Sequence, residues 1–129
     1  MIQLNGLTLA YVGDAVYEMK IREYLIDKGL TKVGDLHQNA ILFTQANSQA
    51  LAALKMTSDF YTEKEINIFK RGRNQSASHK PKNTDVQTYN QSTGFEAVIG
   101  YLYLEESYER VNQVIARTIE IINDLVLKK

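Results

Sequence analysis

Two acidic residues stand inside strongly apolar stretches of this chain, and their side chains are the first candidates for chemistry. Asp14 lies in the run Leu9-Ala-Tyr-Val-Gly-Asp-Ala-Val-Tyr-Glu18, and Glu96 lies near the start of a second apolar run over 92–104. A carboxylate buried without a partner loses favourable hydration or is driven to its neutral form, so something must compensate it. A divalent metal ion shared by the two carboxylates is one candidate.

Each acid also has a purely structural interpretation. Gly13 would end a preceding segment and Asp14 would cap a helix starting at Ala15, since Asp is a favoured N-cap residue. Thr93 and Glu96 have the spacing of a capping box, in which the glutamate reaches back to the helix N-terminus. The residues around the two acids leave both interpretations open.

The apolar residues recur mainly at helical spacing, which predicts an all-α fold. The expected helices cover 7–28, 33–55, a stretch starting at Thr62, 92–104 and 105–129. The third start is the most specific, because Thr62-Glu-Lys-Glu65 fits a capping box. Between the third and fourth helices, the polar stretch 71–91 is predicted to form a loop. Asp14 and Glu96 would then lie on different helices.

Composition restricts both the class of protein and the kind of site. The 129 residues suffice for one domain with a sizeable core, expected over 1–129. Because the chain has no cysteine, disulfides, zinc thiolates and a thiol nucleophile are excluded. There is no signal-peptide pattern and no apolar run of the roughly 18 residues that a membrane span needs, which favours a cytoplasmic protein without a membrane partner.

A local excess of positive charge marks the predicted loop. Lys plus Arg equals Asp plus Glu at 15 each, so no overall field attracts a polyanion. The local cations, which only Asp85 opposes, are Lys70, Arg71, Arg73, Lys80 and Lys82. They predict a polyanion-binding patch, and a solvated loop with incidental charge is the alternative.

Other motifs offer no catalysis. The chain has no glycine-rich phosphate loop, no Gly-x-Ser-x-Gly and no histidine pair at metal-binding spacing. His37 is expected on a helix surface. Glu18, one helical turn after Asp14, is expected to make a structural hydrogen bond or ion pair.

Together the two acidic stretches resemble the catalytic domain of the ribonuclease III family. Gly13-Asp14-Ala15-Val16 with Glu18 matches the family's signature, and Glu96-Ala97-Val98-Ile99-Gly100 matches its second acidic motif. The match runs over nearly the whole chain. Within the family, the stretches 71–74 and 81–89 are similar to the Mini-ribonuclease III subgroup, bacterial forms with the catalytic domain alone and no double-stranded RNA-binding domain.

The resemblance implies a dimeric, all-α ribonuclease III-type domain that hydrolyses double-stranded RNA with Mg²⁺. Asp14 and Glu96 would be the catalytic residues and the metal ligands. For such a substrate, the local basic patch makes Arg71, Arg73, Lys80 and Lys82 the candidate RNA-binding residues.

Partners follow from the same resemblance. Two sites related by a two-fold axis would cut the two strands, so a homodimer is expected, buried through the surplus of apolar residues on the first helix. The implied substrate is precursor 23S ribosomal RNA, matured at its paired ends. A ribosomal protein that presents the RNA is a candidate partner.

The chain departs from the family pattern at three positions. Full-length members carry further acids at the positions of Leu7, Ala10 and Thr93, so only Asp14 and Glu96 carry over as metal ligands. This thinner metal site keeps an alternative open, a catalytically weak or inactive RNA-binding or ribosome-associated module with a ribonuclease III fold. A third possibility is a helical dimerisation module. Metal-dependent cleavage of an RNA duplex, binding without cleavage, or neither would discriminate the three.

Overall fold

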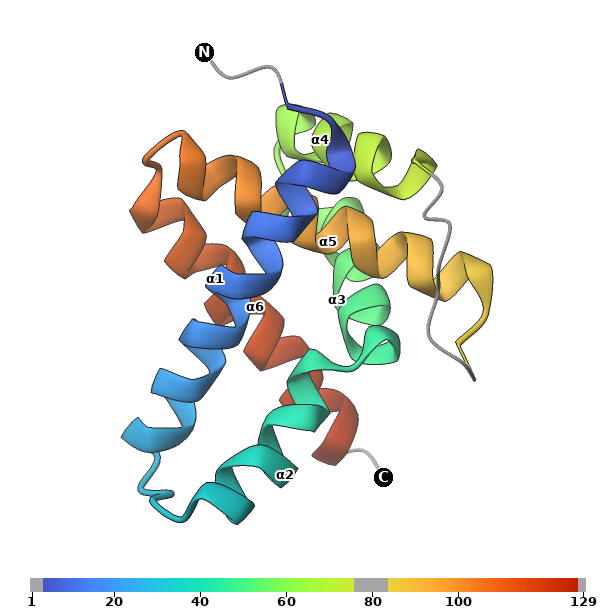
Figure 1. Cartoon of the computed structure of the whole chain (residues 1–129). Coiled ribbons are helices and arrows are strands. Elements are labelled where there is room, and N and C mark those ends of the chain that lie inside the picture. Colours follow the sequence, from blue (N-terminus) through green and yellow to red (C-terminus); the bar gives the residue numbers. More distant parts are fainter. Residues whose placement is uncertain (1–3, 76–83, 128–129) are drawn as a thin grey trace.

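The computed structural model describes residues 4–75 and 84–127. All the regular structure within these residues is helical, which confirms the all-α prediction. The helices are α1 (Gly6–Asp27), α2 (Val33–Thr44), α3 (Ala46–Asp59), α4 (Glu63–Asn74), α5 (Val86–Leu104) and α6 (Tyr108–Leu127). Helix α5 runs through the middle of the bundle and packs against α1, α3, α4 and α6 (Figure 1). None of the described helices is long and apolar enough to cross a membrane.

Helix α1 begins and ends close to the predicted bounds. Its N-cap is Asn5, whose side chain accepts a hydrogen bond from the Thr8 amide, and Gly29 follows its end with a φ of 100°. On this helix Tyr17 is buried, whereas Met19 is 59% exposed. Tyr17 can be buried because its hydroxyl donates to the Phe43 carbonyl at 2.8 Å.

The helical region predicted over 33–55 is two helices rather than one. Gln45 ends α2 and precedes α3 with an extended backbone (φ −67°, ψ 150°). Its side-chain amide donates to Ser48 Oγ at 3.1 Å, which holds the turn between the helices. On α3, Ala50, Ala52 and Ala53 are buried, and their small side chains permit close packing.

Much of the predicted loop over 71–91 is also helical. Helix α4 starts at its predicted capping box at Thr62 but continues to Asn74, so Arg71 and Arg73 lie on a helix. Helix α5 starts at Val86 rather than at residue 92, because the Asp85 side chain accepts a hydrogen bond from the Thr88 amide and caps it. The prediction failed because the first turns of α5 show no apolar periodicity. Lys80 and Lys82 lie outside the described residues.

Glycines let α1, α4 and α5 approach to backbone contact. A Cβ atom on Gly13 would lie 1.8 Å from the Glu96 carbonyl oxygen, and one on Gly100 would lie 1.9 Å from the Leu9 carbonyl oxygen. On α4, a Cβ atom on Gly72 would lie 2.9 Å from the Gly94 Cα atom. No larger residue fits these positions without moving a helix, so the glycines determine how the three helices cross.

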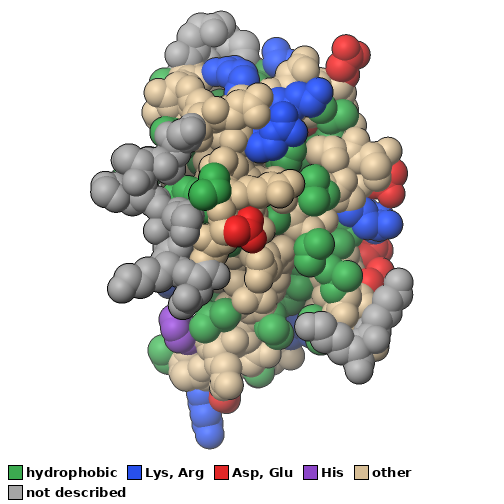
Figure 2. All heavy atoms as spheres, turned by 90° about the vertical axis from the view of Figure 1, so that its right-hand side faces the viewer, with side chains coloured by type: hydrophobic (Ala, Val, Ile, Leu, Met, Phe, Trp, Pro, Cys, Tyr) green, Lys and Arg blue, Asp and Glu red, His purple; other side chains and the backbone are tan. Residues whose placement is uncertain are grey.

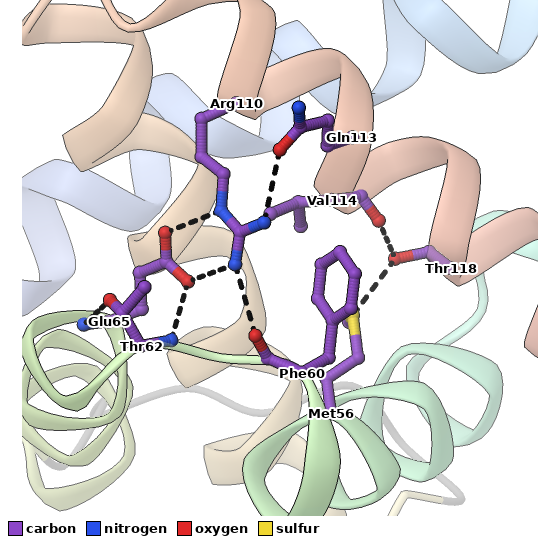
Figure 3. A network of polar contacts seen from close by, with 8 residues as sticks. All are labelled: Met56, Phe60, Thr62, Glu65, Arg110, Gln113, Val114 and Thr118. Atoms are coloured by element: carbon purple, nitrogen blue, oxygen red, sulfur yellow. Dashed lines mark hydrogen bonds and ion pairs between the residues drawn. The ribbon is translucent and has the colours of Figure 1, made fainter.

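A buried ion pair joins α4 to α6 (Figure 3). Glu65 is 3% exposed, and both its carboxylate oxygens accept hydrogen bonds of 2.8 Å from Arg110. The same guanidinium donates to the Phe60 carbonyl, and the Thr62 amide donates to Glu65. Since all four groups are satisfied by one another, the start of α4 is held firmly against α6.

Candidate active site

The crossing of α1 and α5 brings Asp14 and Glu96 together. Gly13 packs directly on the Glu96 carbonyl, so the two acids lie side by side at the point of closest approach. Both line one cavity of about 430 Å³, which also receives side chains from α3 and from the end of α2. Its lining residues are Leu7, Ala10, Tyr11, Asp14, Thr44, Ala46, Gln49, Tyr89, Ser92, Thr93 and Glu96.

The structure contradicts the helix-capping interpretation of both acids. Asp14 lies inside α1, whose N-cap is Asn5. Glu96 lies inside α5, whose N-cap is Asp85, so Thr93 and Glu96 form no capping box. Thr93 instead donates its hydroxyl to the Tyr89 carbonyl at 3.1 Å.

Of the two acids, only Glu96 is partly buried. The apolar run around Asp14 suggested that this carboxylate is buried, but Asp14 is exposed, on the open side of the crossing. The reason is that the buried face of α1 contains Gly13 and Tyr17, and Asp14, the residue after Gly13, points away from that face. Glu96 is half-buried, and the residues on either side of it in α5 are buried. The cost of desolvation therefore concerns Glu96.

The environment of Glu96 disfavours its charged form. Burial, together with a hydrogen bond to Asp14 and repulsion from that carboxylate, raises the pKa of Glu96 to about 9. A hydrogen bond from the Gln49 side chain acts in the opposite direction. At neutral pH Glu96 therefore keeps a proton unless another positive charge takes its place.

The donor set fits a hard divalent cation. Such a cation would relieve the repulsion between the two carboxylates, and Mg²⁺ commonly takes only one or two protein carboxylates. No cluster of three or more His, Cys, Asp or Glu side chains suited to a metal occurs within 4–75 and 84–127. Leu7, Ala10 and Thr93, the positions where the resemblance places further acids, all line this cavity.

Sequence reasoning missed Gln49 as part of this site. Its side chain is 2% exposed, and its Oε1 accepts a hydrogen bond of 2.5 Å from Ser92 Oγ. A signal was present in the sequence, because Gln49 interrupts an alanine-rich stripe through Ala46, Ala50 and Ala53. A glutamine on a stripe that small apolar residues otherwise occupy indicates a buried polar contact.

Two of the predicted RNA-binding residues flank Gly72, the glycine at which α4 packs against α5. Arg71 and Arg73 stand on either side of Gly72, and Arg71 donates to the Leu4 carbonyl. Nearby, the Gln75 side chain accepts a hydrogen bond of 2.8 Å from the Leu7 amide, at the rim of the cavity. Figure 2 shows Lys and Arg side chains gathered in the upper part of one face, the end of the molecule where α4 lies. The predicted basic patch is thus partly helical.

A second hollow adjoins the acids on the outer side of α1. It has a volume of about 640 Å³ and includes Asp14, Ala15, Met19 and Tyr103 in its lining. Tyr11, also in the lining, is 81% exposed. Glu18 is not among the residues that line the acidic cavity, and it forms the expected ion pair, 3.2 Å from Arg22. His37 is exposed on α2, as predicted.

Comparisons with known proteins give consistent results. A model of the Ribonuclease III domain matches residues 7–107. Mini-ribonuclease 3 of Streptococcus pneumoniae is 50% identical over 91% of this chain and 92% of that protein. Mini-ribonuclease 3 of Staphylococcus aureus is 45% identical over 94% of this chain and 91% of that protein. The crystal structure of a Fusobacterium nucleatum protein superposes with a TM-score of 0.80 at 30% identity, covering 92% of this chain and 93% of that one.

Proposed function

Because this chain belongs to the ribonuclease III family and is an endoribonuclease of double-stranded RNA, we propose that Asp14 and Glu96 form its active site and together hold Mg²⁺. The observation that carries this proposal is the pairing of the two carboxylates in one cavity, where Glu96 is kept protonated in the absence of a cation. Nucleases of this family are typically metal-dependent, and the proposal names the metal and its ligands.

The residues around the acids favour attack by water. Two of the hydroxyl groups in the cavity lining, those of Ser92 and Thr93, are buried, and each donates its proton to a protein acceptor. On cation binding, the Glu96 proton would be displaced to solvent, and the two carboxylates would hold the cation by their charge. Bound Mg²⁺ supplies an electrophile for the scissile phosphate and lowers the pKa of a coordinated water. The aliphatic side chains of Leu7 and Ala10 contribute no further ligand from α1.

Isosteric substitutions test this assignment. Asp14→Asn and Glu96→Gln should each lower the rate of duplex cleavage about a thousandfold or more, since several kcal/mol of charge stabilisation is lost at about tenfold per 1.4 kcal/mol. The matched control is Glu18→Gln, which removes a carboxylate from the same helix outside the cavity and should cleave normally. Circular dichroism checks that each variant is folded. Wild-type turnover by either site variant would contradict the assignment.

We further propose that Arg71 and Arg73, together with Lys80 and Lys82, hold the phosphates of the RNA. Support comes from the packing of Gly72 against Gly94, which places the two arginines beside the helix that carries Glu96. The A-form duplex is recognised mainly by its shape, phosphates and 2′-hydroxyls, contacts that such cations can make.

The salt dependence of duplex binding tests this patch. In Ca²⁺, the pair of substitutions Arg71→Ala and Arg73→Ala should weaken binding and make the log–log salt slope shallower by roughly 0.9 per lost contact. The matched control is Lys32→Ala with Lys55→Ala, which removes two exposed cations, one at the N-cap of α2 and one on α3. An unchanged slope in the arginine variant would place the RNA elsewhere.

A homodimer through the outer face of α1 completes the proposal. One site cuts one strand, so a two-fold axis is needed for a double-strand cut. The exposed apolar side chains of Tyr11, Met19 and Tyr103 support a buried interface beside Asp14. Met19→Glu should give a monomer in sedimentation velocity, whereas Val33→Glu, at an 80% exposed position of α2, should leave the dimer intact. A wild-type monomer at micromolar concentration would contradict the interface.

The biological substrate we propose is precursor 23S ribosomal RNA in the cytoplasm, with a ribosomal protein that presents the paired ends. This proposal is supported by the similarity to the Mini-ribonuclease III subgroup rather than by a feature of the site. Cells without the protein should accumulate 23S RNA with extended ends, and the purified enzyme should trim them. Normal ends in such cells would contradict it.

A further inference from the structure

Gln49 is a buried amide in the lining of the acidic cavity. It lies on α3, lines the cavity with Asp14 and Glu96, and is 2% exposed. Burying an amide is unfavourable unless its oxygen and its nitrogen both find partners. The partners of Gln49 therefore indicate why a polar residue occupies this position.

One partner fixes the orientation of the amide. Ser92 donates its hydroxyl proton to Gln49 Oε1, so the NH₂ group is directed away from Ser92. Ser92 and Glu96 are four residues apart on α5 and thus project from the same face of that helix. The NH₂ group is therefore the end of the Gln49 side chain that is free to donate to Glu96, which lines the same cavity. The Gln49 side chain thus spans both residues from the opposite helix.

A hydrogen-bond donor beside Glu96 matters because few other groups hold the carboxylates of this site in place. Among the described residues that line the cavity there are only two acids, and one of them, Asp14, is exposed. A glutamate side chain has several rotatable bonds, and its carboxylate must be held in one orientation to bind a cation tightly. Groups that hydrogen-bond to a metal ligand and orient it commonly change metal affinity 10- to 100-fold.

We propose that Gln49 is a positioning residue that holds the Glu96 carboxylate in its cation-binding orientation, with Ser92 holding Gln49. The inference rests on the proposed role of Glu96 as a metal ligand. It extends the site to α3, a helix that contributes no acid to the cavity. A merely structural amide would contribute to the free energy of unfolding but would leave cation affinity unchanged.

Direct measurement of cation binding separates these roles. The variant Gln49→Met keeps the side-chain volume but loses both hydrogen bonds. Its affinity for Mn²⁺ in the absence of RNA, measured by electron paramagnetic resonance, should fall about 10- to 100-fold. Ser92→Ala frees Gln49 and should weaken binding less. Cleavage should show the same shift in the Mn²⁺ concentration for half-maximal rate, with affinity for duplex RNA in the absence of divalent ions unchanged.

The matched control is Thr118→Val, which removes a fully buried hydroxyl on α6, hydrogen-bonded to the Val114 carbonyl and absent from the cavity lining. It should lower stability without changing Mn²⁺ affinity. Wild-type Mn²⁺ affinity in Gln49→Met would overturn the inference, and if that variant fails to fold, wild-type affinity in Ser92→Ala overturns it. If Glu96→Gln itself binds Mn²⁺ and cleaves RNA normally, the failure lies with the proposed active site instead.

Discussion

The glycine contact between α1 and α5 can be tested by adding one methyl group. Gly100→Ala places a Cβ atom 1.9 Å from the Leu9 carbonyl oxygen, whereas ordinary contacts begin at 3.4 Å. The obstacle is backbone, so no side chain can rotate away. Helices α1 and α5 must separate by about 1.5 Å or tilt, and the carboxylates of Asp14 and Glu96 move apart with them.

The expected loss of stability follows from two opposing effects. Overpacking a core costs about 1–3 kcal/mol or more, and a clash with rigid backbone belongs at the upper end. Alanine is the better helix former and returns about 1 kcal/mol. The free energy of unfolding of Gly100→Ala should therefore fall by about 2 kcal/mol or more, with cleavage reduced as well.

Urea denaturation followed by circular dichroism measures this change at a fixed protein concentration. The matched control is Gly34→Ala on α2, where a Cβ atom would meet nothing within 4 Å. This control should gain roughly 0.5 kcal/mol, because the unfolded chain loses freedom without a clash. If Gly100→Ala were as stable and as active as the wild type, the close crossing would not be what brings the acids together.

Three further predictions concern buried polar groups. Glu65→Gln should lower the free energy of unfolding by about 3 kcal/mol in urea denaturation, because it leaves the Arg110 guanidinium without its counter-charge. Tyr61→Phe should be neutral or stabilising, since the buried Tyr61 hydroxyl lacks a partner among the described residues, whereas Tyr17→Phe should cost about 1 kcal/mol by losing its bond to a carbonyl. The folded protein raises the pKa of Glu96 from 4.5 to about 9. The contribution of Glu96 to the free energy of unfolding, measured in EDTA, should therefore be greatest below pH 4.5 and should fall as the pH rises to 9. Glu96→Gln should flatten that dependence, and an equally steep decline in the variant would contradict the shift.

Local chemistry made much of the fold predictable. The bounds of α1, the Thr62 capping box and the all-helical class follow from apolar spacing and from side chains that act within a few residues. The break at Gln45 and the start of α5 at Val86 were missed. Gln45 is neither Gly nor Pro, and the first turns of α5 are partly exposed, so neither boundary leaves a strong local pattern.

The sequence by itself identified the two residues that we propose as catalytic. Asp14 and Glu96 stand out as lone acids in apolar runs, and their motifs identify the family without any coordinates. Only the tertiary structure decided how they differ, with Asp14 exposed and Glu96 half-buried in surroundings that raise its pKa. The reason is physical. Burial and pKa depend on which helix faces which, and that is decided by backbone contacts at Gly13 and Gly100, far apart in the chain.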